Sequence, residues 1–141
     1  MAEPLLRLTT STEVDEATDR AIGDGLDAYN ATQVPGDWKM LWVVGRDDAD
    51  AARCGLKAVT AYDWLFVAWL WVGEAHRRQG LGSRLLRQAE EVARERGCLS
   101  SYLDTFSFQA PEFYKRHGYQ EFGRLENFPR GHRRIWFRKA L

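Results

Sequence analysis

The sequence is poor in several features, and each shortage excludes a class of protein. Only two cysteines occur, Cys54 and Cys98, with neither the spacing of a metal site nor the number needed for a disulfide framework. Basic and acidic residues both number 20, so the charge does not suggest general binding to nucleic acid or membrane surfaces. No run approaches the ~20 apolar residues of a membrane span, and the N-terminus lacks a signal-peptide pattern. We therefore expect a cytoplasmic protein without a metal site.

What the chain does contain is enough apolar sequence for one core. It has 141 residues, of which 45% are hydrophobic and 13% aromatic. This size and composition suit one globular domain. Internal repeats, low-complexity tracts and linkers are missing from the pattern. We therefore predict a single domain that spans residues 1–141.

The most informative stretch of the sequence is 65–83. Residues 65–72, LFVAWLWV, form an unbroken apolar run that is typical of a strand buried on both faces. A basic, glycine-containing turn follows, and apolar residues with helical period begin at Leu81. Such a strand–turn–helix unit directs free backbone N–H groups and the positive end of a helix dipole at one place, which predicts an anion site. Gly80 and Gly82 would let a diphosphate approach the backbone.

The remaining elements follow from periodicity and turn signals. The strands between residues 38 and 72 are typical of an antiparallel meander, and a strand at 100–105 should pair in parallel with 65–72 after a right-handed crossover. The sequence thus predicts an α/β (α+β) fold with a mixed, mostly antiparallel sheet of about seven strands and flanking helices. The expected strands are 5–9, 38–46, 51–61, 65–72, 100–105, 119–128 and 132–140, the last two joined by a type I turn at 128–131. The expected helices run from an N-cap at Ser11 or Thr12 to about Asn30, with a break or bend near Gly23 and Gly25, from 81 to 96, and from Pro111 to His117.

Three segments together resemble one family. Residues 77–82, Arg-x-x-Gly-x-Gly at a strand-to-helix turn, resemble the acyl-CoA pyrophosphate motif of the GNAT N-acetyltransferase superfamily. Residues 70–72 of the preceding strand and 110–119, Ala-x-x-x-Tyr-x-x-x-Gly-Tyr, stand where that family keeps its other signature residues. The resemblance covers essentially the whole chain. It implies a GNAT-like fold and an enzyme that moves an acetyl group directly from acetyl-CoA to a primary amine.

The resemblance also implies roles for particular residues. Backbone amides of residues 78–83 would hold the pyrophosphate, and residues 70–72 would pair with the pantetheine arm like an added strand. Tyr114 would act as the general acid. Two positions depart from the family pattern: Ser107 replaces a common asparagine, and Glu74 replaces a usual proline. The expected cofactor-binding residues are Leu70, Trp71, Val72, Arg77, Arg78, Gln79, Gly80, Leu81, Gly82, Ser83, Ser107, Gln109 and Tyr114.

Each catalytic role competes with an ordinary structural role for the same residue. A tyrosine with an ordinary pKa of ~10 is matched to protonate a thiolate leaving group, although a tyrosine on a helix often only packs against a sheet. We take Glu74 as the candidate base because it is nearest the cofactor turn. Asp63, Asp104 and Glu112 are alternatives, and each alone is more commonly a solvated carboxylate. Together these acidic groups would suit a cationic amine.

Basic and aromatic residues divide between function and structure. Arg77, Arg78 and Arg84 oppose the dipole at a helix start, so a bound polyanion explains them better than stabilisation does. His76 in the same turn suggests a structural or phosphate-side role. The tryptophans could include an aromatic wall for a substrate, but most are expected in the core. The basic C-terminal hairpin is expected to be a solvated outer strand or a dimer edge.

Two alternatives to the enzyme stay open at this point. A catalytically silent acyl-CoA-binding or regulatory module could use the same fold. A nucleotide-binding protein is less compatible, because the chain lacks Gly-x-x-x-x-Gly-Lys-Ser/Thr. The resemblance makes a homodimer through the C-terminal strands an option, with no nucleic acid or membrane partner. The acceptor amine, the base (a side chain or a chain of waters) and the use of acyl groups longer than acetyl are left open by the sequence.

Overall fold

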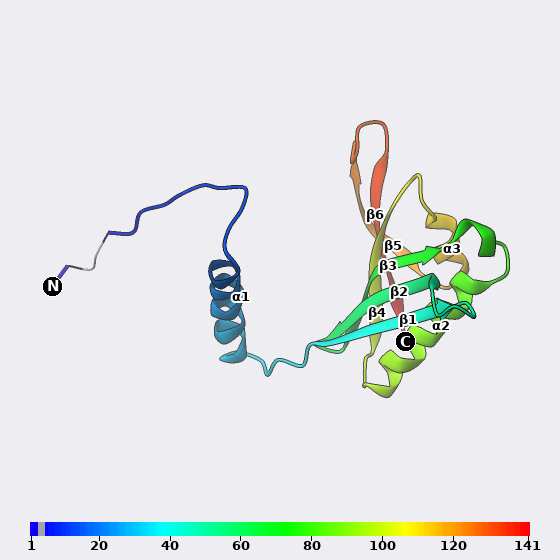
Figure 1. Cartoon of the computed structure of the whole chain (residues 1–141), viewed down its shortest axis with the longest axis horizontal. Helices are drawn as coiled ribbons and strands as arrows, with labels where there is room; N and C mark the ends of the chain where they lie inside the picture. The colour runs from blue at the N-terminus through cyan, green and yellow to red at the C-terminus, as the bar shows by residue number, and fades with distance from the viewer. Residues whose placement is uncertain (3–4) are drawn as a thin grey trace. The chain divides into compact units, whose positions relative to one another are not determined.

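The computed structural model describes residues 1–2 and 5–141, and it divides into two units, Met1–Gly36 and Asp37–Leu141 (Figure 1). None of the described helices is long and apolar enough to cross a membrane. The single domain expected from the sequence stays a prediction.

The first unit contains one helix, α1 (Glu16–Ala31). Its N-cap is Asp15, whose carboxylate accepts hydrogen bonds from the backbone N–H of Thr18 (3.0 Å) and from its hydroxyl (2.6 Å). The predicted cap at Ser11 or Thr12 is therefore wrong, because Asp15, three or four residues further on, caps the helix start. The helix continues through Gly23 and Gly25, so of the predicted break or bend the break is wrong. Each glycine costs only about 1 kcal/mol relative to alanine, which 16 continuous residues of helix tolerate.

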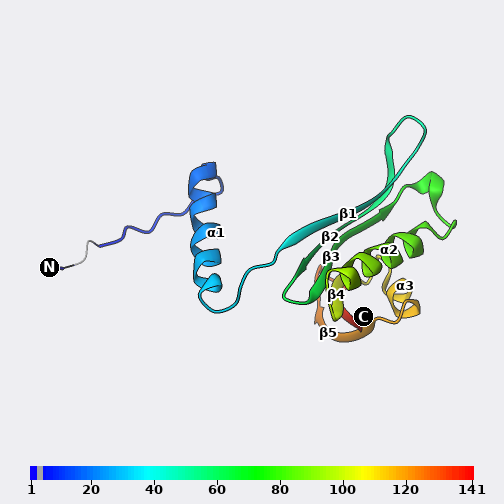
Figure 2. The ribbon, with the colours of Figure 1, turned by 90° about the horizontal axis from the view of Figure 1, so that it is seen from below.

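The second unit is built on a six-stranded sheet of order β1-β2-β3-β4-β6-β5 (Figures 1 and 2). The predicted antiparallel meander and the parallel pairing of β3 with β4 are both confirmed. The sheet has six strands instead of about seven because no strand forms at the described residues 5–10. Its strands are β1 (Lys39–Arg46), β2 (Ala52–Ala61), β3 (Trp64–Val72), β4 (Ser100–Phe106), β5 (Gln120–Glu126) and β6 (Arg133–Ala140).

Three helical segments complete the second unit: the short 3₁₀ helix η1 (Glu74–His76), α2 (Leu81–Glu95) and α3 (Pro111–Arg116). The α2 helix packs against β1, β2 and β3. Its buried stripe of leucine and alanine meets alternate strand residues, as the period-two pattern requires. The core contains Leu41, Val43, Leu56, Leu65, Val67, Leu85, Leu86, Ala89, Ala93, Leu103, Tyr114, Tyr119, Ile135 and Phe137, among others.

The sheet is exposed on the face opposite this core. Trp69 has 68% of its surface exposed and Trp42 57%, so the prediction that the tryptophans are mostly in the core is wrong. The prediction that residues 65–72 are buried on both faces is wrong for the same reason, since only Leu65 and Val67 of that run are buried. We call this surface the tryptophan face. Its members are Met40, Trp42, Val44, Trp64, Trp69 and Trp71.

The final hairpin turns one residue later than predicted. The backbone N–H of His132 donates to the carbonyl of Pro129 (2.8 Å), so the turn closes over 129–132 and not over 128–131. Gly131 takes a positive φ of 84°, which suits glycine.

Candidate active site

A cleft opens in the sheet where β3 and β4 stop pairing. Their registered pairs cover only Trp64–Val67 of β3 and Ser100–Leu103 of β4. Beyond this point β3 stays paired with β2 as far as Val72, and β4 stays paired with β6 as far as Phe106, so the two parallel strands diverge. The cleft has a volume of about 870 Å³. Its lining consists of residues 67–72, 76–78 and 80–83, with Asp104, Thr105, Phe108, Gln109, Ala110, Phe113, Tyr114 and Arg116.

A β-bulge marks the point of divergence. Val67 is opposite Ala58 and Trp69 is opposite Lys57, which leaves Ala68 as the extra residue in β3. A bulge bends its strand and re-aims the residues that follow. The backbone of residues 68–72 therefore borders the cleft outside the registered pairs with β4. This geometry suits the edge that was predicted to receive an extended ligand arm.

The turn after β3 presents the start of α2 to the cleft. Arg77 donates from Nε to the carbonyl of Val72 (3.0 Å), which ties the turn back to the strand. Gly80 is the N-cap, with φ 74°, and no side chain caps the helix. The first backbone bond into this cap comes from Arg84 (3.1 Å). The amides of residues 81–83 consequently have no partner within the helix, which is the arrangement of an anion site.

Glycine is needed at positions 80 and 82 of this turn for two different structural reasons. Gly80 adopts the left-handed conformation, and a Cβ added there would meet no atom within 4 Å. A Cβ on Gly82 would lie 3.4 Å from Cζ of Phe113 on α3. Gly82 therefore allows α2 and α3 to approach closely, in addition to any role toward a ligand.

Tyr114, the residue after Phe113 on α3, lies in the wall of the same cleft, with 8% of its surface exposed. Burial, and to a smaller extent the charge of Asp104, raises the pKa of its hydroxyl from 10.0 to about 12. Its ring packs edge-on against Phe113, with 5.1 Å between centroids. The phenol is therefore held in place and protonated near neutral pH, the state that a proton donor needs.

A buried network of hydrogen bonds and one ion pair lies next to Tyr114. The hydroxyl of Tyr119 donates to the carboxylate of Glu90 (2.9 Å) and accepts from Ser101 (2.8 Å). Lys139 Nζ lies 2.9 and 3.0 Å from the two carboxylate oxygens of Glu90, which is 2% exposed. Burial raises the pKa of Tyr119. The network joins α2, β4 and β6 and gives Tyr119, whose ring contacts Tyr114, a fixed position.

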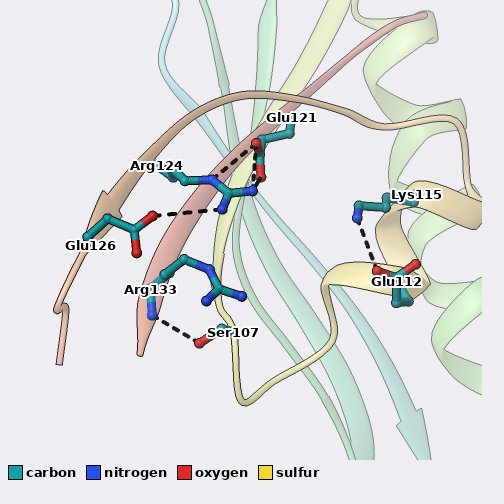
Figure 3. Close-up of polar contacts among 7 residues, drawn as sticks. All are labelled: Ser107, Glu112, Lys115, Glu121, Arg124, Glu126 and Arg133. Atoms are coloured by element: carbon teal, nitrogen blue, oxygen red, sulfur yellow. Dashed lines mark hydrogen bonds and ion pairs between the residues drawn. The ribbon is translucent and has the colours of Figure 1, made fainter. Parts of the chain in front are cut away.

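Of the four carboxylates singled out in the sequence, Asp104 alone lines the cleft. It accepts a hydrogen bond from Nε of Arg134 (2.7 Å). Glu74 is exposed in η1 and does not line the cleft. Glu112 forms an exposed pair with Lys115 at 3.0 Å (Figure 3). Asp63 lies in the β2–β3 turn, at the opposite end of β3 from the cofactor turn.

Two of the residues expected to contact the pantetheine arm hold the loop after β4. Ser107 lies outside the cleft lining, and its Oγ accepts a hydrogen bond from the backbone N–H of Arg133 (3.0 Å; Figure 3). Gln109 lines the cleft, but its Oε1 accepts from the backbone N–H of Phe106 (2.8 Å) and from the hydroxyl of Thr105 (3.2 Å). Gln79, in the turn, is exposed and does not line the cleft. The other expected cofactor-binding residues do line it: Leu70, Trp71, Val72, Arg77, Arg78, Gly80, Leu81, Gly82, Ser83 and Tyr114.

Sequence reasoning missed several residues of the cleft. Arg116 stands between Lys115 and His117 at the end of a helix, where basic residues are expected for stability and do not indicate a site. Phe113 precedes Tyr114 and gave no signal beyond an apolar helix position. Phe108 belongs to a loop without periodicity, where its ring stacks on Phe106 at 5.2 Å.

Comparisons with known proteins agree with this geometry. The family model described as "Acetyltransferase (GNAT) domain" matches residues 37–121. An acetyltransferase of Agrobacterium fabrum is 36% identical over 137 residues, which are 96% of this chain and 100% of that protein. The crystal structure of a protein from Agrobacterium tumefaciens has a TM-score of 0.91 and 36% identity, and the match covers 96% of this chain and 100% of the other.

A third relative is matched over part of its length. The blasticidin-S acetyltransferase of Streptomyces morookaense is 45% identical over 78 residues, which are 55% of this chain and 57% of that protein. The family model covers more than half of the chain, and the match with the Agrobacterium fabrum acetyltransferase covers nearly all of it. The chain belongs to the GNAT family and is an acyl-CoA-dependent N-acetyltransferase.

Proposed function

We propose that the cleft binds acetyl-CoA and transfers the acetyl group directly to the primary amine of a small cationic acceptor. The observation that carries the proposal is the divergence of β3 from β4 beside the uncapped start of α2. The divergence of the strands provides a strand edge for an amide-containing arm, and the uncapped helix start provides free amides for a diphosphate. Coenzyme A contains both groups in one molecule.

Main-chain groups would bind acetyl-CoA at two places, the pyrophosphate and the pantetheine arm. The amides of residues 81–83 would hold the pyrophosphate, with the backbone of Leu70–Val72 along the pantetheine arm. Arg78 and Arg116 line the same cleft and supply positive charge for the phosphates. Arg77 would contribute charge while its Nε remains bonded to Val72.

The transfer step would need one base and one acid. A neutral amine attacks the thioester carbonyl, the C–N bond forms, and the oxyanion of the tetrahedral intermediate is stabilised by a backbone N–H of residues 70–72. The C–S bond then breaks, and the CoA thiolate takes the proton of the Tyr114 hydroxyl. The proton lost by the amine would pass to water at the open side of the cleft, and the Tyr114 tyrosinate would regain a proton from the same water. Glu74 lies outside the cleft lining, so any part it takes would be through such water.

Asp104 would recruit the acceptor. Its carboxylate lies at the cleft, and among the described residues its cationic partner is Arg134. A carboxylate at this position favours a positively charged amine over a neutral one. The partial relative named for blasticidin S makes small, amine-bearing molecules the first acceptors to test.

The experiment is a calorimetric titration followed by an acceptor screen. Acetyl-CoA should bind, with ATP and NAD binding far more weakly, and at least one small cationic amine should release CoA in a thiol assay. Tighter binding of ATP or NAD would overturn the proposal for the cleft. Binding of acetyl-CoA without CoA release for any amine would instead favour the silent binding module.

A further inference from the structure

The cleft has one closed end, at the point where β3 and β4 begin to diverge. Val67 is the last residue of β3 that pairs with β4, and its partner is Leu103. Leu103 in turn lies opposite Phe137 of β6. These three side chains form a row across the sheet, and each is at most 4% exposed. Val67 also lines the cleft, so it is the member of the row at which the cleft meets the core.

Two further buried side chains complete this closed end. The ring of Tyr114 packs against the row, with 6.2 Å between its centroid and that of Phe137. Thr105 follows Leu103 by two residues on the same side of β4, is buried and lines the cleft. Its hydroxyl donates to Oε1 of Gln109 (3.2 Å), which fixes the side chain. Because packed protein interiors leave few voids, the closed end has little room for a larger group.

The proposed position of the donor directs its acyl group to this closed end. With the pyrophosphate at the amides of residues 81–83, the pantetheine arm would run along β3 from Val72 toward Ala68, a distance of about 13 Å. The thioester is at the end of the arm that is far from the phosphates. An acetyl group there would contact Val67, and each added methylene would press on the buried row.

A longer acyl group has no better route toward the other side of β4. Side chains alternate along a strand, so Asp104 is on the opposite side from Leu103 and Thr105. Asp104 lines the cleft and is the carboxylate proposed to recruit the amine. An acyl chain that turned toward Asp104 would occupy the place of the acceptor. Added length therefore either crowds the core or blocks the attacking amine.

We propose that Val67 selects the acyl chain and limits the enzyme to short acyl groups, with acetyl preferred over propionyl and butyryl. The inference rests on the proposed function, because it uses the donor position proposed there. One methylene too many in an apolar pocket changes kcat/KM by about 10- to 200-fold. Val67→Ala removes two methyl groups from the closed end, the same number of carbon atoms by which butyryl exceeds acetyl.

The test compares acetyl-CoA, propionyl-CoA and butyryl-CoA with one active amine. In the wild type, kcat/KM should fall about tenfold from acetyl to propionyl and about 100-fold from acetyl to butyryl. Val67→Ala should raise kcat/KM for butyryl-CoA at least tenfold relative to acetyl-CoA. Val67→Ile adds a methyl group and should lower kcat/KM for propionyl-CoA further. Val43→Ala is the matched control and should keep the wild-type selectivity, because Val43 is a buried valine of the sheet that does not line the cleft.

A wild type that uses butyryl-CoA as well as acetyl-CoA would overturn the inference, and so would equal selectivity in Val67→Ala and Val43→Ala. Circular dichroism checks that each variant is folded, and Val67→Ile provides the test if Val67→Ala is not. Calorimetry separates this failure from a failure of the proposed reaction. If no thioester releases CoA, the proposed reaction is wrong, but butyryl-CoA should still bind the wild type at least tenfold more weakly than acetyl-CoA. Equal Kd values for the two thioesters would then contradict the role of Val67.

Discussion

Asp104 and Tyr114 define the proposed acceptor end of the cleft at the level of single residues. One carries a charge that attracts a cation, and the other carries a proton that a thiolate can accept. Burial raises the pKa of Tyr114, and the charge of Asp104 adds to this shift. Replacing either residue should therefore change a different kinetic constant.

Asp104→Asn should raise KM for a cationic amine by about tenfold, equivalent to ~1.4 kcal/mol of lost attraction. The Kd for acetyl-CoA should change little, because the phosphate turn is at the other end of the cleft. Steady-state kinetics with cationic and neutral amines would measure the effect. Glu112→Gln is the matched control, because Glu112 is exposed and pairs with Lys115 outside the cleft (Figure 3). An equal loss in both variants would remove Asp104 from the acceptor site.

Tyr119 illustrates a residue whose role is structural. Tyr119→Phe removes the hydroxyl that donates to Glu90 and accepts from Ser101. We expect the free energy of unfolding to fall by about 1–3 kcal/mol, because buried polar groups lose a partner. Urea denaturation would measure this change. Tyr102→Phe, in which the ring stacking on Phe66 is kept, should cost much less.

At the scale of elements, the start of α2 carries the donor half of the site. Gly82→Val should weaken acetyl-CoA binding at least tenfold, since the new side chain would press on Phe113 and crowd the amides of the turn. Gly97→Ala offers a comparison at the other end of the same helix, where Gly97, unlike Gly82, has a positive φ of 86°. It should lower stability without a change in the Kd measured by calorimetry. Unchanged binding by Gly82→Val would contradict the assignment of the pyrophosphate to this turn.

The elements that could be predicted from the sequence are those with strong local signals. The helix that starts at Leu81, the short helix that starts at Pro111 and the antiparallel meander are where periodicity and turn residues indicate them. The tryptophan face was not predictable in the same way, because an apolar run such as 65–72 does not reveal whether its second face is covered. Residues 5–9 have strand-forming side chains, but a strand also needs a neighbour with which to pair.

The residues of the cleft could be predicted where a local sequence motif indicates them, and they were missed where tertiary packing brings them to the cleft. The glycine turn and Tyr114 line the cleft, as their local sequence motifs indicate. Ser107 is predicted from the family's asparagine position and Glu74 from its nearness to the cofactor turn, but the fold directs Ser107 to Arg133 and leaves Glu74 exposed. Arg116 reaches the cleft only because α3 packs beside Gly82, which no local pattern indicates.

At the scale of the whole molecule, two buried tyrosines predict how stability depends on pH. Burial raises the pKa of Tyr114 from its ordinary value of 10.0 to about 12, and it raises the pKa of Tyr119 as well. The folded state therefore holds these protons more tightly than the unfolded state does. The stabilisation is fully present below pH ~10 and is lost as the pH rises through the pKa values of the folded state. Thermal unfolding from pH 8 to 12 should show a falling Tm above pH ~10, and the fall should be smaller in Tyr119→Phe.

The central claim is that Tyr114 donates the proton to the departing CoA thiolate, and one paired measurement tests it most directly. For Tyr114→Phe, we expect kcat with an active amine to fall by about 10²-fold or more, while the Kd for acetyl-CoA stays within twofold of the wild type. Tyr102→Phe, a tyrosine outside the cleft, should leave both constants unchanged. A Tyr114→Phe enzyme that binds acetyl-CoA normally and turns over at the wild-type rate would contradict the account.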